Sequence, residues 1–180
     1  MSSSRNANAD RAHPAGEAVH TGHSAGTGNL VAEAAPAADG IKAFPSHIPF
    51  LHDLGAEFVR MENGESEVTL LLEHRHTNSW NVAHGGVVMA LLDVVMSMAA
   101  RSLDPLSHGG VTIEMKSTFM QPAGSPGKRI RACGKVAYHA KSLVFCESEV
   151  WDGERLAARA MGTFKLVRRL DAAKKLEHRD

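Results

Sequence analysis

Residues 85–100 read GGVVMALLDVVMSMAA and form the longest apolar segment of the chain. The segment lacks the regularly spaced polar residues that give a surface helix its solvent-facing side. It therefore predicts a helix that neighbouring elements wrap on nearly every side. Since a transmembrane helix needs ~20 apolar residues, we expect this helix in a protein core and not in a bilayer.

Strand patterns lie on both sides of the apolar segment. Two candidate strands precede it, and Asn63-Gly64 between them is a strong signal for a two-residue hairpin turn. Four candidate strands follow it, joined by the short connections QPAGSPGK (rich in Gly and Pro), His139-Ala140-Lys141 and Asp152-Gly153. Because a parallel crossover needs a dozen residues or more, we expect consecutive strands to pair antiparallel. The six candidate strands are residues 55–61, 66–72, 110–120, 129–138, 142–151 and 155–167.

This order of elements predicts an α+β hotdog fold, in which one antiparallel β-sheet wraps around a long central apolar helix. Such a sheet leaves an edge and part of the helix uncovered, so we expect a homodimer. We expect the folded domain to span residues 44–169, between a disordered tail (residues 1–43) and a charged extension (residues 170–180). The tail has no aromatic residue and too little apolar surface to offset the entropy of ordering it.

The composition excludes several functional classes. The 180 residues include 20 Lys+Arg and 20 Asp+Glu, so the formal net charge is zero and provides no basic field for nucleic acid or an anionic membrane. The two cysteines form no CxxC motif, which excludes a disulfide framework and a four-cysteine zinc site. The N-terminus lacks the apolar stretch of a secretory signal. We therefore expect a cytoplasmic protein that binds neither nucleic acid nor membrane.

Asp93 lies in the middle of the apolar segment, where a leucine would pack better. No basic residue lies within one helical turn of it and Arg101 is two turns away, so any partner must come from elsewhere in the fold. Buried carboxylates with perturbed pKa values concentrate at active sites, which makes Asp93 the candidate catalytic residue. The alternative is a structural carboxylate that pairs with an arginine or lies at a solvated rim.

The dipeptide Gly85-Gly86 begins the predicted helix. Glycines let a ligand approach the backbone closely, and the first N–H groups of a helix point at negative charge that develops on a carbonyl oxygen. The helix start and Asp93 are about 10 Å apart along the axis. We therefore expect two antiparallel protomers to bring Gly85 of one chain near Asp93 of the other. One stripe of the helix carries Gly86, Met89, Asp93 and Ser97.

The segment from Asn78 to Asp93 resembles the signature of the PaaI-like acyl-CoA thioesterases of the hotdog superfamily. Those proteins show Asn or Gln six residues before the His of an HGG motif and Asp or Glu nine residues after it. Asn78 and Asp93 stand at those spacings from His84. The likeness extends over residues 53–167 and includes residues 110–116, 119–123 and 154–164.

The resemblance implies roles for four catalytic residues. Asp93 would be the general base for the hydrolytic water, or a nucleophile that forms a mixed anhydride. The Gly85 N–H would bind the thioester carbonyl oxygen, and Asn78 would position the water or the carbonyl. Thr112 would hydrogen-bond near the attacking water. No cofactor is implied, because coenzyme A is part of the substrate.

The resemblance also implies a set of substrate-binding residues. His84 would hold the loop by hydrogen bonding, and Lys141 and Ser142 would meet the coenzyme A phosphates. Asn81 stands where many relatives carry glycine; it tolerates positive φ, but the acyl pocket would differ in shape. Trp80 and Phe119 are candidate walls for the acyl group. The full set is His84, Gly86, Asn81, Trp80, Lys141 and Ser142.

Several alternatives remain open. We expect no metal site, because His74, His76 and His84 have no HExxH motif or Cys partner and are interpreted as solvated histidines at strand ends.

Rival functions are a hotdog dehydratase or hydratase on acyl thioesters, and a non-catalytic acyl-CoA-binding protein. A small aryl and a medium-chain acyl group fit the sequence equally, as do a dimer and a dimer of dimers (homotetramer).

Overall fold

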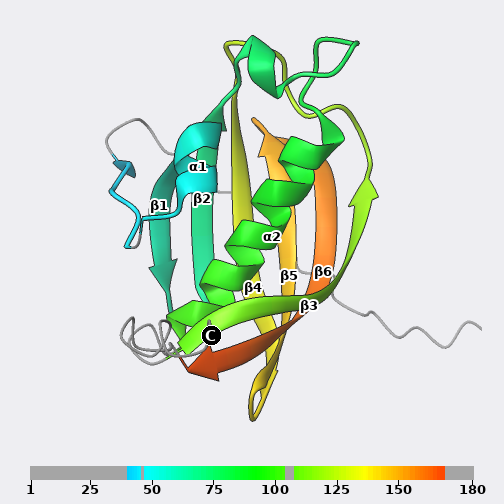
Figure 1. The fold of residues 1–180 in the computed structure, drawn as a ribbon. Helices are drawn as coiled ribbons and strands as arrows, with labels where there is room; N and C mark the ends of the chain where they lie inside the picture. The colour runs from blue at the N-terminus through cyan, green and yellow to red at the C-terminus, as the bar shows by residue number, and fades with distance from the viewer. Residues whose placement is uncertain (1–39, 46, 104–107, 169–180) are drawn as a thin grey trace, which may run out of the picture.

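The computed structural model describes residues 40–45, 47–103 and 108–168. It confirms the α+β hotdog architecture: α2 packs against one side of a six-stranded antiparallel sheet (Figure 1). Asn63 and Gly64, the predicted hairpin turn, both have the positive φ angles (51° and 78°) that this turn requires. The elements are α1 (Pro49–Leu54), β1 (Ala56–Glu62), β2 (Glu65–Leu71), the 3-10 helix η2 (His74–His76), α2 (Gly85–Ser102), β3 (His108–Phe119), β4 (Arg129–Ala140), β5 (Leu143–Asp152) and β6 (Arg155–Arg168).

The strand order is β1-β2-β4-β5-β6-β3, with β1 and β3 at the two edges of the described sheet. The prediction that consecutive strands pair is correct for β1–β2, β4–β5 and β5–β6, but wrong for β3 and β4. β3 pairs with β6, and β4 pairs with β2. The connection between β3 and β4 carries the chain across the end of the sheet, where the Gly127 N–H donates to the Leu72 carbonyl and the Leu72 N–H donates to the Lys128 carbonyl.

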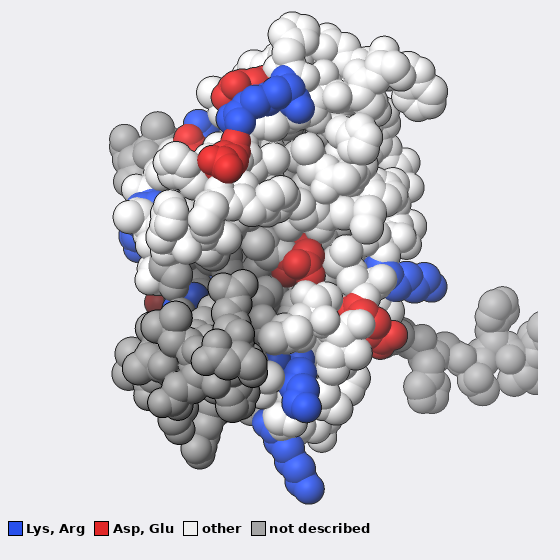
Figure 2. All heavy atoms as spheres, viewed as in Figure 1, with Lys and Arg blue, Asp and Glu red and all other residues white. Residues whose placement is uncertain are grey.

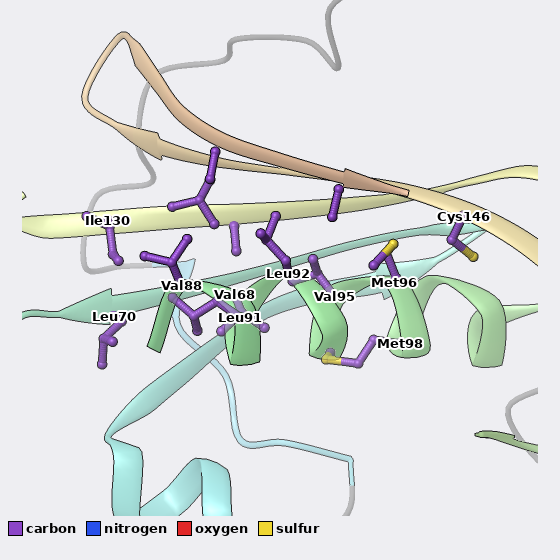
Figure 3. Close-up of a cluster of buried hydrophobic side chains, with 14 of the residues drawn as sticks. Val68, Leu70, Val88, Leu91, Leu92, Val95, Met96, Met98, Ile130 and Cys146 are labelled. Carbon is purple, nitrogen blue, oxygen red and sulfur yellow. The ribbon is translucent and has the colours of Figure 1, made fainter. Parts of the chain in front are cut away.

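One side of α2 packs on the sheet and forms the core with it (Figure 3). Of the side chains labelled there, Val88, Leu91, Leu92, Val95, Met96 and Met98 come from α2, and Val68, Leu70, Ile130 and Cys146 come from the strands. By length and mean hydropathy (1.4) α2 could cross a membrane, but the core helix of a soluble protein passes the same test.

The backbone of α2 lies close to the sheet at Gly134 of β4. A Cβ atom on Gly134 would lie 2.3 Å from the Val95 carbonyl oxygen and 2.9 Å from the Met96 nitrogen, closer than real Cβ contacts. The Ser66 hydroxyl of β2 donates a 2.5 Å hydrogen bond to the same Val95 carbonyl. These two contacts fix the height and position of α2 above the sheet.

The other side of α2 is only partly covered by the described chain. Met89 is 42% exposed, and Asp93 and Ser97 are partly buried. Within the described chain, the helix is therefore wrapped on its other sides but not along this stripe, which agrees with the expectation that a single sheet leaves part of the helix uncovered. The predicted stripe itself is confirmed, because its four members are exposed or partly buried while their neighbours Val88, Leu92 and Met96 are buried.

The predicted terminal segments fall mostly outside the described residues. Residues 1–39 of the predicted tail and the predicted extension (residues 170–180) are not described, so these domain boundaries remain predictions. Within the described part, the Lys42 N–H donates to the Phe58 carbonyl at 2.8 Å. The chain therefore contacts β1 two residues before the predicted start of the folded domain.

Candidate active site

The loop before α2 is a tight, hydrogen-bonded turn. The Asn78 N–H donates to the Val82 carbonyl, and the Asn78 side-chain oxygen accepts from the N–H groups of Trp80 (2.9 Å) and Val82 (3.5 Å). Asn81 has φ 57°, so the predicted tolerance of positive φ at this position is used. The Asn78 side-chain oxygen is thus engaged in shaping the loop, and a role in positioning water or a carbonyl stays a prediction.

His76 and His84 hold the two ends of this loop. The His84 N–H donates to the His76 carbonyl at 2.8 Å, and the His76 Nδ1 accepts from the Glu73 N–H at 2.9 Å. His76 is 2% exposed, so the expectation of a solvated histidine is wrong there. The reason is that its ring folds back onto its own 3-10 turn, where its nitrogen pairs with a backbone donor.

His84 is the N-cap of α2, and it leaves one backbone donor of the first turn unused. Its Nδ1 accepts from the Gly86 N–H at 2.9 Å, which is the loop-holding hydrogen bond expected for His84. The N–H groups of Val87 and Val88 donate to the His84 carbonyl. Within the described chain, the Gly85 N–H is the only one of these four without a hydrogen bond, so it is available to a carbonyl oxygen.

A groove of about 300 Å³ opens beside Gly85. A Cβ atom on Gly85 would lie 3.8 Å from the ring of Phe119, so the end of β3 forms the wall next to the unused N–H. Trp80 is 82% exposed and forms another wall. The groove is lined by Asn78, Trp80, Val82, Ala83, Gly85, Val88, Phe119, Met120, Gln121, Pro122, Ala123 and Ala158.

Asp93 lies on the outward stripe of α2, and its partner comes from β3. The Thr112 hydroxyl donates a 2.7 Å hydrogen bond to Asp93 Oδ1, which confirms that a partner comes from elsewhere in the fold. Ser97 lies one turn further along the same stripe, and a Cβ atom on Gly110 would lie 3.1 Å from its hydroxyl. An acid with adjacent hydroxyl groups can orient a water molecule and accept its proton.

Asp93 and the unused Gly85 N–H lie apart within one chain. Asp93 follows Gly85 by eight residues, which is about 12 Å along the helix axis. Figure 2 shows one carboxylate side chain among uncharged atoms near the centre of the face that carries α2 and β3, and the other charged groups lie toward its edges. A single chain therefore presents the acid and the unused N–H as two separate half-sites.

Lys141 and Ser142 lie far from this loop within one chain. They form the turn between β4 and β5, where Lys141 has φ 55°. β4 starts beside Leu71 at the loop end of the sheet, and the Lys141 turn lies at the opposite end (Figure 1). Their predicted contact with coenzyme A phosphates therefore needs a second subunit, or a ligand that runs the length of the sheet.

Sequence reasoning did not single out several groove residues. Met120 and Gln121 follow the end of β3, and Ala158 lies opposite Phe119 in β6. The available signal was Pro122, which ends the strand and forces a change of direction right after Phe119. Among the described residues, no group of three His, Cys, Asp or Glu side chains is arranged to hold a metal ion.

Comparisons with known proteins identify the family of this chain. Residues 81–158 match the family described as "Thioesterase superfamily". A Saccharolobus solfataricus protein named "Putative esterase" is 31% identical over 124 residues, or 68% of this chain and 81% of that protein. Mus musculus acyl-coenzyme A thioesterase 13 is 29% identical over 79 residues, or 44% of this chain and 55% of that protein.

Solved structures give the same result. A mutant of the phenylacetic acid degradation protein PaaI from Thermus thermophilus is 25% identical, with a TM-score of 0.60 over 68% of this chain and 100% of that chain. A conserved protein from Pseudomonas aeruginosa is 26% identical, with a TM-score of 0.61 over 73% of this chain and 100% of that chain. The chain belongs to the thioesterase superfamily, with the hotdog fold and PaaI proteins among its structural neighbours.

Proposed function

We propose that this protein hydrolyses the thioester of an acyl-CoA to a free acid and coenzyme A. The observation that carries the proposal is Asp93, the only carboxylate of α2, which lies partly buried on the outward stripe and accepts the Thr112 hydroxyl. The unused Gly85 N–H beside an apolar groove is the complementary half-site. Membership of the thioesterase superfamily supports this pairing of an acid with an oxyanion donor.

The two half-sites would meet in a homodimer built on β3. Thr112 near the start of β3 bonds to Asp93, whereas Phe119 at its end lies beside Gly85. Antiparallel pairing of β3 with β3 of a second copy would bring the Thr112 end of one strand to the Phe119 end of the other. β3 lies at an edge of the described sheet, and its segment carries the exposed apolar side chains Val111, Ile113, Phe119 and Met120.

The chemistry follows from these groups. A water molecule near the Thr112 hydroxyl loses a proton to Asp93 while its oxygen bonds to the thioester carbon. The carbonyl oxygen gains negative charge and accepts a hydrogen bond from the partner's Gly85 N–H. The C–S bond then breaks, and the coenzyme A thiolate takes the proton from Asp93. In the second route, Asp93 attacks the carbon directly, the C–S bond breaks and the coenzyme A thiolate leaves, and water then hydrolyses the resulting anhydride to the free acid and the Asp93 carboxylate. A base contributes ~10²–10⁴-fold and an oxyanion donor ~10²–10³-fold in rate.

The lining of the groove favours a small aryl or medium-chain acyl group as its ligand. Its side-chain walls include Trp80, Val88, Phe119 and Met120, which are apolar and present no charge to the ligand. In such a dimer, the Lys141-Ser142 turn is a candidate contact for the phosphates. We further assign the protein to the cytoplasm, as a dimer or dimer of dimers that needs no cofactor beyond the coenzyme A of its substrate.

The test is a panel of aryl and aliphatic acyl-CoA thioesters, assayed by release of the free thiol. Asp93→Asn should lower turnover at least a hundredfold, because it removes the base while keeping the side-chain shape. Its unfolding free energy should stay close to that of the wild type, and Glu154→Gln, in the exposed β5–β6 turn, is the matched control. Wild-type turnover in Asp93→Asn would remove Asp93 from the mechanism; hydration of enoyl-CoA without thiol release would favour a hydratase.

A further inference from the structure

Two opposite charges lie side by side on the exposed edge strand β3. Glu114 and Lys116 are both exposed, and they pair in β6 with Thr163 and Met161. The Thr163 hydroxyl donates to Glu114 at 3.0 Å. Because Phe164 of β6 belongs to the core, its neighbour Thr163 faces away from α2, and so do the two charges.

The two charges line the same groove on the face of the sheet away from α2. This groove measures about 400 Å³, and a second carboxylate, Glu147, lines it together with Met161 and Phe145. Met161 is 58% exposed and Phe145 is 40% exposed, so the surroundings of the charges are partly apolar. Opposite charges brought together in such surroundings interact more strongly than in open water.

The proposed function requires β3 to pair with β3 of a second copy. The charges of Glu114 and Lys116 favour one register of this pair over the others. In a two-fold antiparallel pair of identical strands, one residue opposes its own copy. With Glu114 at that position two carboxylates meet, and with Lys116 there two ammonium groups meet. With Met115 there, each Glu114 faces Lys116 of the partner subunit. Like charges directly opposite one another destabilise a strand pair, and opposite charges stabilise it.

We propose that Met115 lies at the two-fold axis and that two Glu114–Lys116 pairs between subunits fix the register of the dimer. No other register of two β3 strands gives both pairs. The chain has a formal net charge of zero, so no overall repulsion opposes the association of two copies. Val111 and Ile113, which are 52% and 57% exposed, would become covered in the same contact.

This register also sets the geometry of the shared site. The β-bulge between Thr112 and Glu114 adds one residue to β3, so Thr112 would oppose Ser117 of the partner subunit and Gly110 would oppose Phe119 of the partner subunit. A slip that keeps the same faces together is two residues, about 6.8 Å along the strand. A slip of that size would change the distance from Asp93 to the partner's Gly85, so the two charge pairs that fix the register would also fix this distance.

Disulfide cross-linking of three variants, each with one added cysteine, tests the register. Glu114→Cys, Met115→Cys and Lys116→Cys are each self-opposed in a different register. Directly opposed residues lie within bridging distance, whereas diagonal neighbours are roughly 7–8 Å apart and cross-link poorly. We expect Met115→Cys to form a covalent dimer at least about tenfold faster than the other two under mild oxidation. The wild type is the control, because its Cys133 and Cys146 are buried.

Faster cross-linking of Glu114→Cys or Lys116→Cys would overturn the proposed register, as would a wild-type chain that is monomeric in light scattering. These outcomes are distinct from failure of the thioesterase proposal, since cross-linking does not depend on turnover. If Met115→Cys cross-links and no acyl-CoA is hydrolysed, the register stands and the enzyme assignment fails.

Charge reversal is a second measurement, which does not depend on the folding of the cysteine variants. Glu114→Lys and Lys116→Glu should each raise the dimer dissociation constant roughly tenfold, because two attractive pairs become repulsive. The double variant Glu114→Lys/Lys116→Glu restores both pairs and should return the constant to within about threefold of the wild type. A double variant that is as weak as the single variants would contradict the proposal.

Discussion

The two sides of α2 are held in different ways. On the buried side, the helix backbone itself is the contact: the Gly134 backbone lies against the Val95 carbonyl, and the Ser66 hydroxyl binds the same oxygen. On the outward side, the contact is between side chains, where Thr112 of β3 donates to Asp93. The backbone contacts fix where the helix lies, and the side-chain contact fixes how its acid is oriented. Stability and catalysis should therefore respond to different substitutions.

The largest effect is expected from Gly134→Ala, on the buried side. Its Cβ would overlap backbone atoms, which cannot move aside as the end of a side chain can. We expect a loss of about 3 kcal/mol or more of unfolding free energy, measured by urea denaturation. Gly109→Ala is the matched control, since a Cβ there has no atom within 4 Å. Equal stability of the two variants would show that the backbone contact does not anchor α2.

The next effect is expected from Thr112→Val, on the outward side. The substitution keeps the shape of the side chain but removes the hydroxyl that donates to Asp93. A hydrogen bond to a charged group contributes about 1.5–3 kcal/mol, so turnover should fall roughly tenfold to hundredfold. Thr112→Ser retains the donor and should keep most of the activity. Unchanged turnover in Thr112→Val would show that the function of Asp93 does not depend on its hydrogen bond from Thr112.

A smaller effect is expected from Ser66→Ala, again on the buried side. It removes the only side-chain hydrogen bond seen to the Val95 carbonyl in the described chain, without adding a clash. We expect a loss of about 1 kcal/mol of unfolding free energy, with little change in the turnover of the folded enzyme. A large change in turnover at unchanged stability would mean that the two sides of α2 are not independent.

The smallest effect concerns Cys146, which packs in the core with the buried side of α2. Burial raises the pKa of its thiol from an ordinary value of 9.0 to about 12. Between these values the unfolded chain loses the proton and the folded chain keeps it, so the unfolding free energy should fall as the pH rises above 9. The unfolding free energy, measured by denaturation at pH 8 and at pH 10, should differ less between the two pH values in Cys146→Ala than in the wild type. An identical pH dependence would contradict this.

The outline of the fold could be predicted because its signals are local. The strand patterns and turn residues such as Asn63-Gly64 located the six strands to within about two residues. The unbroken apolar segment located α2 with the same accuracy. The position of β3 could not be predicted in this way. A turn signal such as Gly124 or Gly127 shows that the chain changes direction, but not that it crosses to the other edge of the sheet.

The candidate site shows the same division. The position of Asp93 in an apolar run indicated both its importance and a partner from elsewhere in the fold. The family resemblance implied only that Thr112 lies near the attacking water. The structure identifies Thr112 as the partner of Asp93, which no spacing along the chain could have shown, because the two residues belong to different elements. The burial of His76 was not predictable, because the contact that satisfies its Nδ1 is the Glu73 N–H, a backbone group that carries no sequence signal.

The connection between β3 and β4 has a consequence for how this fold can change. Gln121, Pro122 and Ala123 belong to this crossing segment and also line the groove. The Ala83 N–H donates to the Gly124 carbonyl, so the same segment is tied to the loop before α2. Surface loops usually tolerate insertions, but a residue added here would alter both the path of the chain and the shape of the groove. Changes in groove shape that leave the fold intact should therefore arise from substitutions in this segment and not from changes in its length.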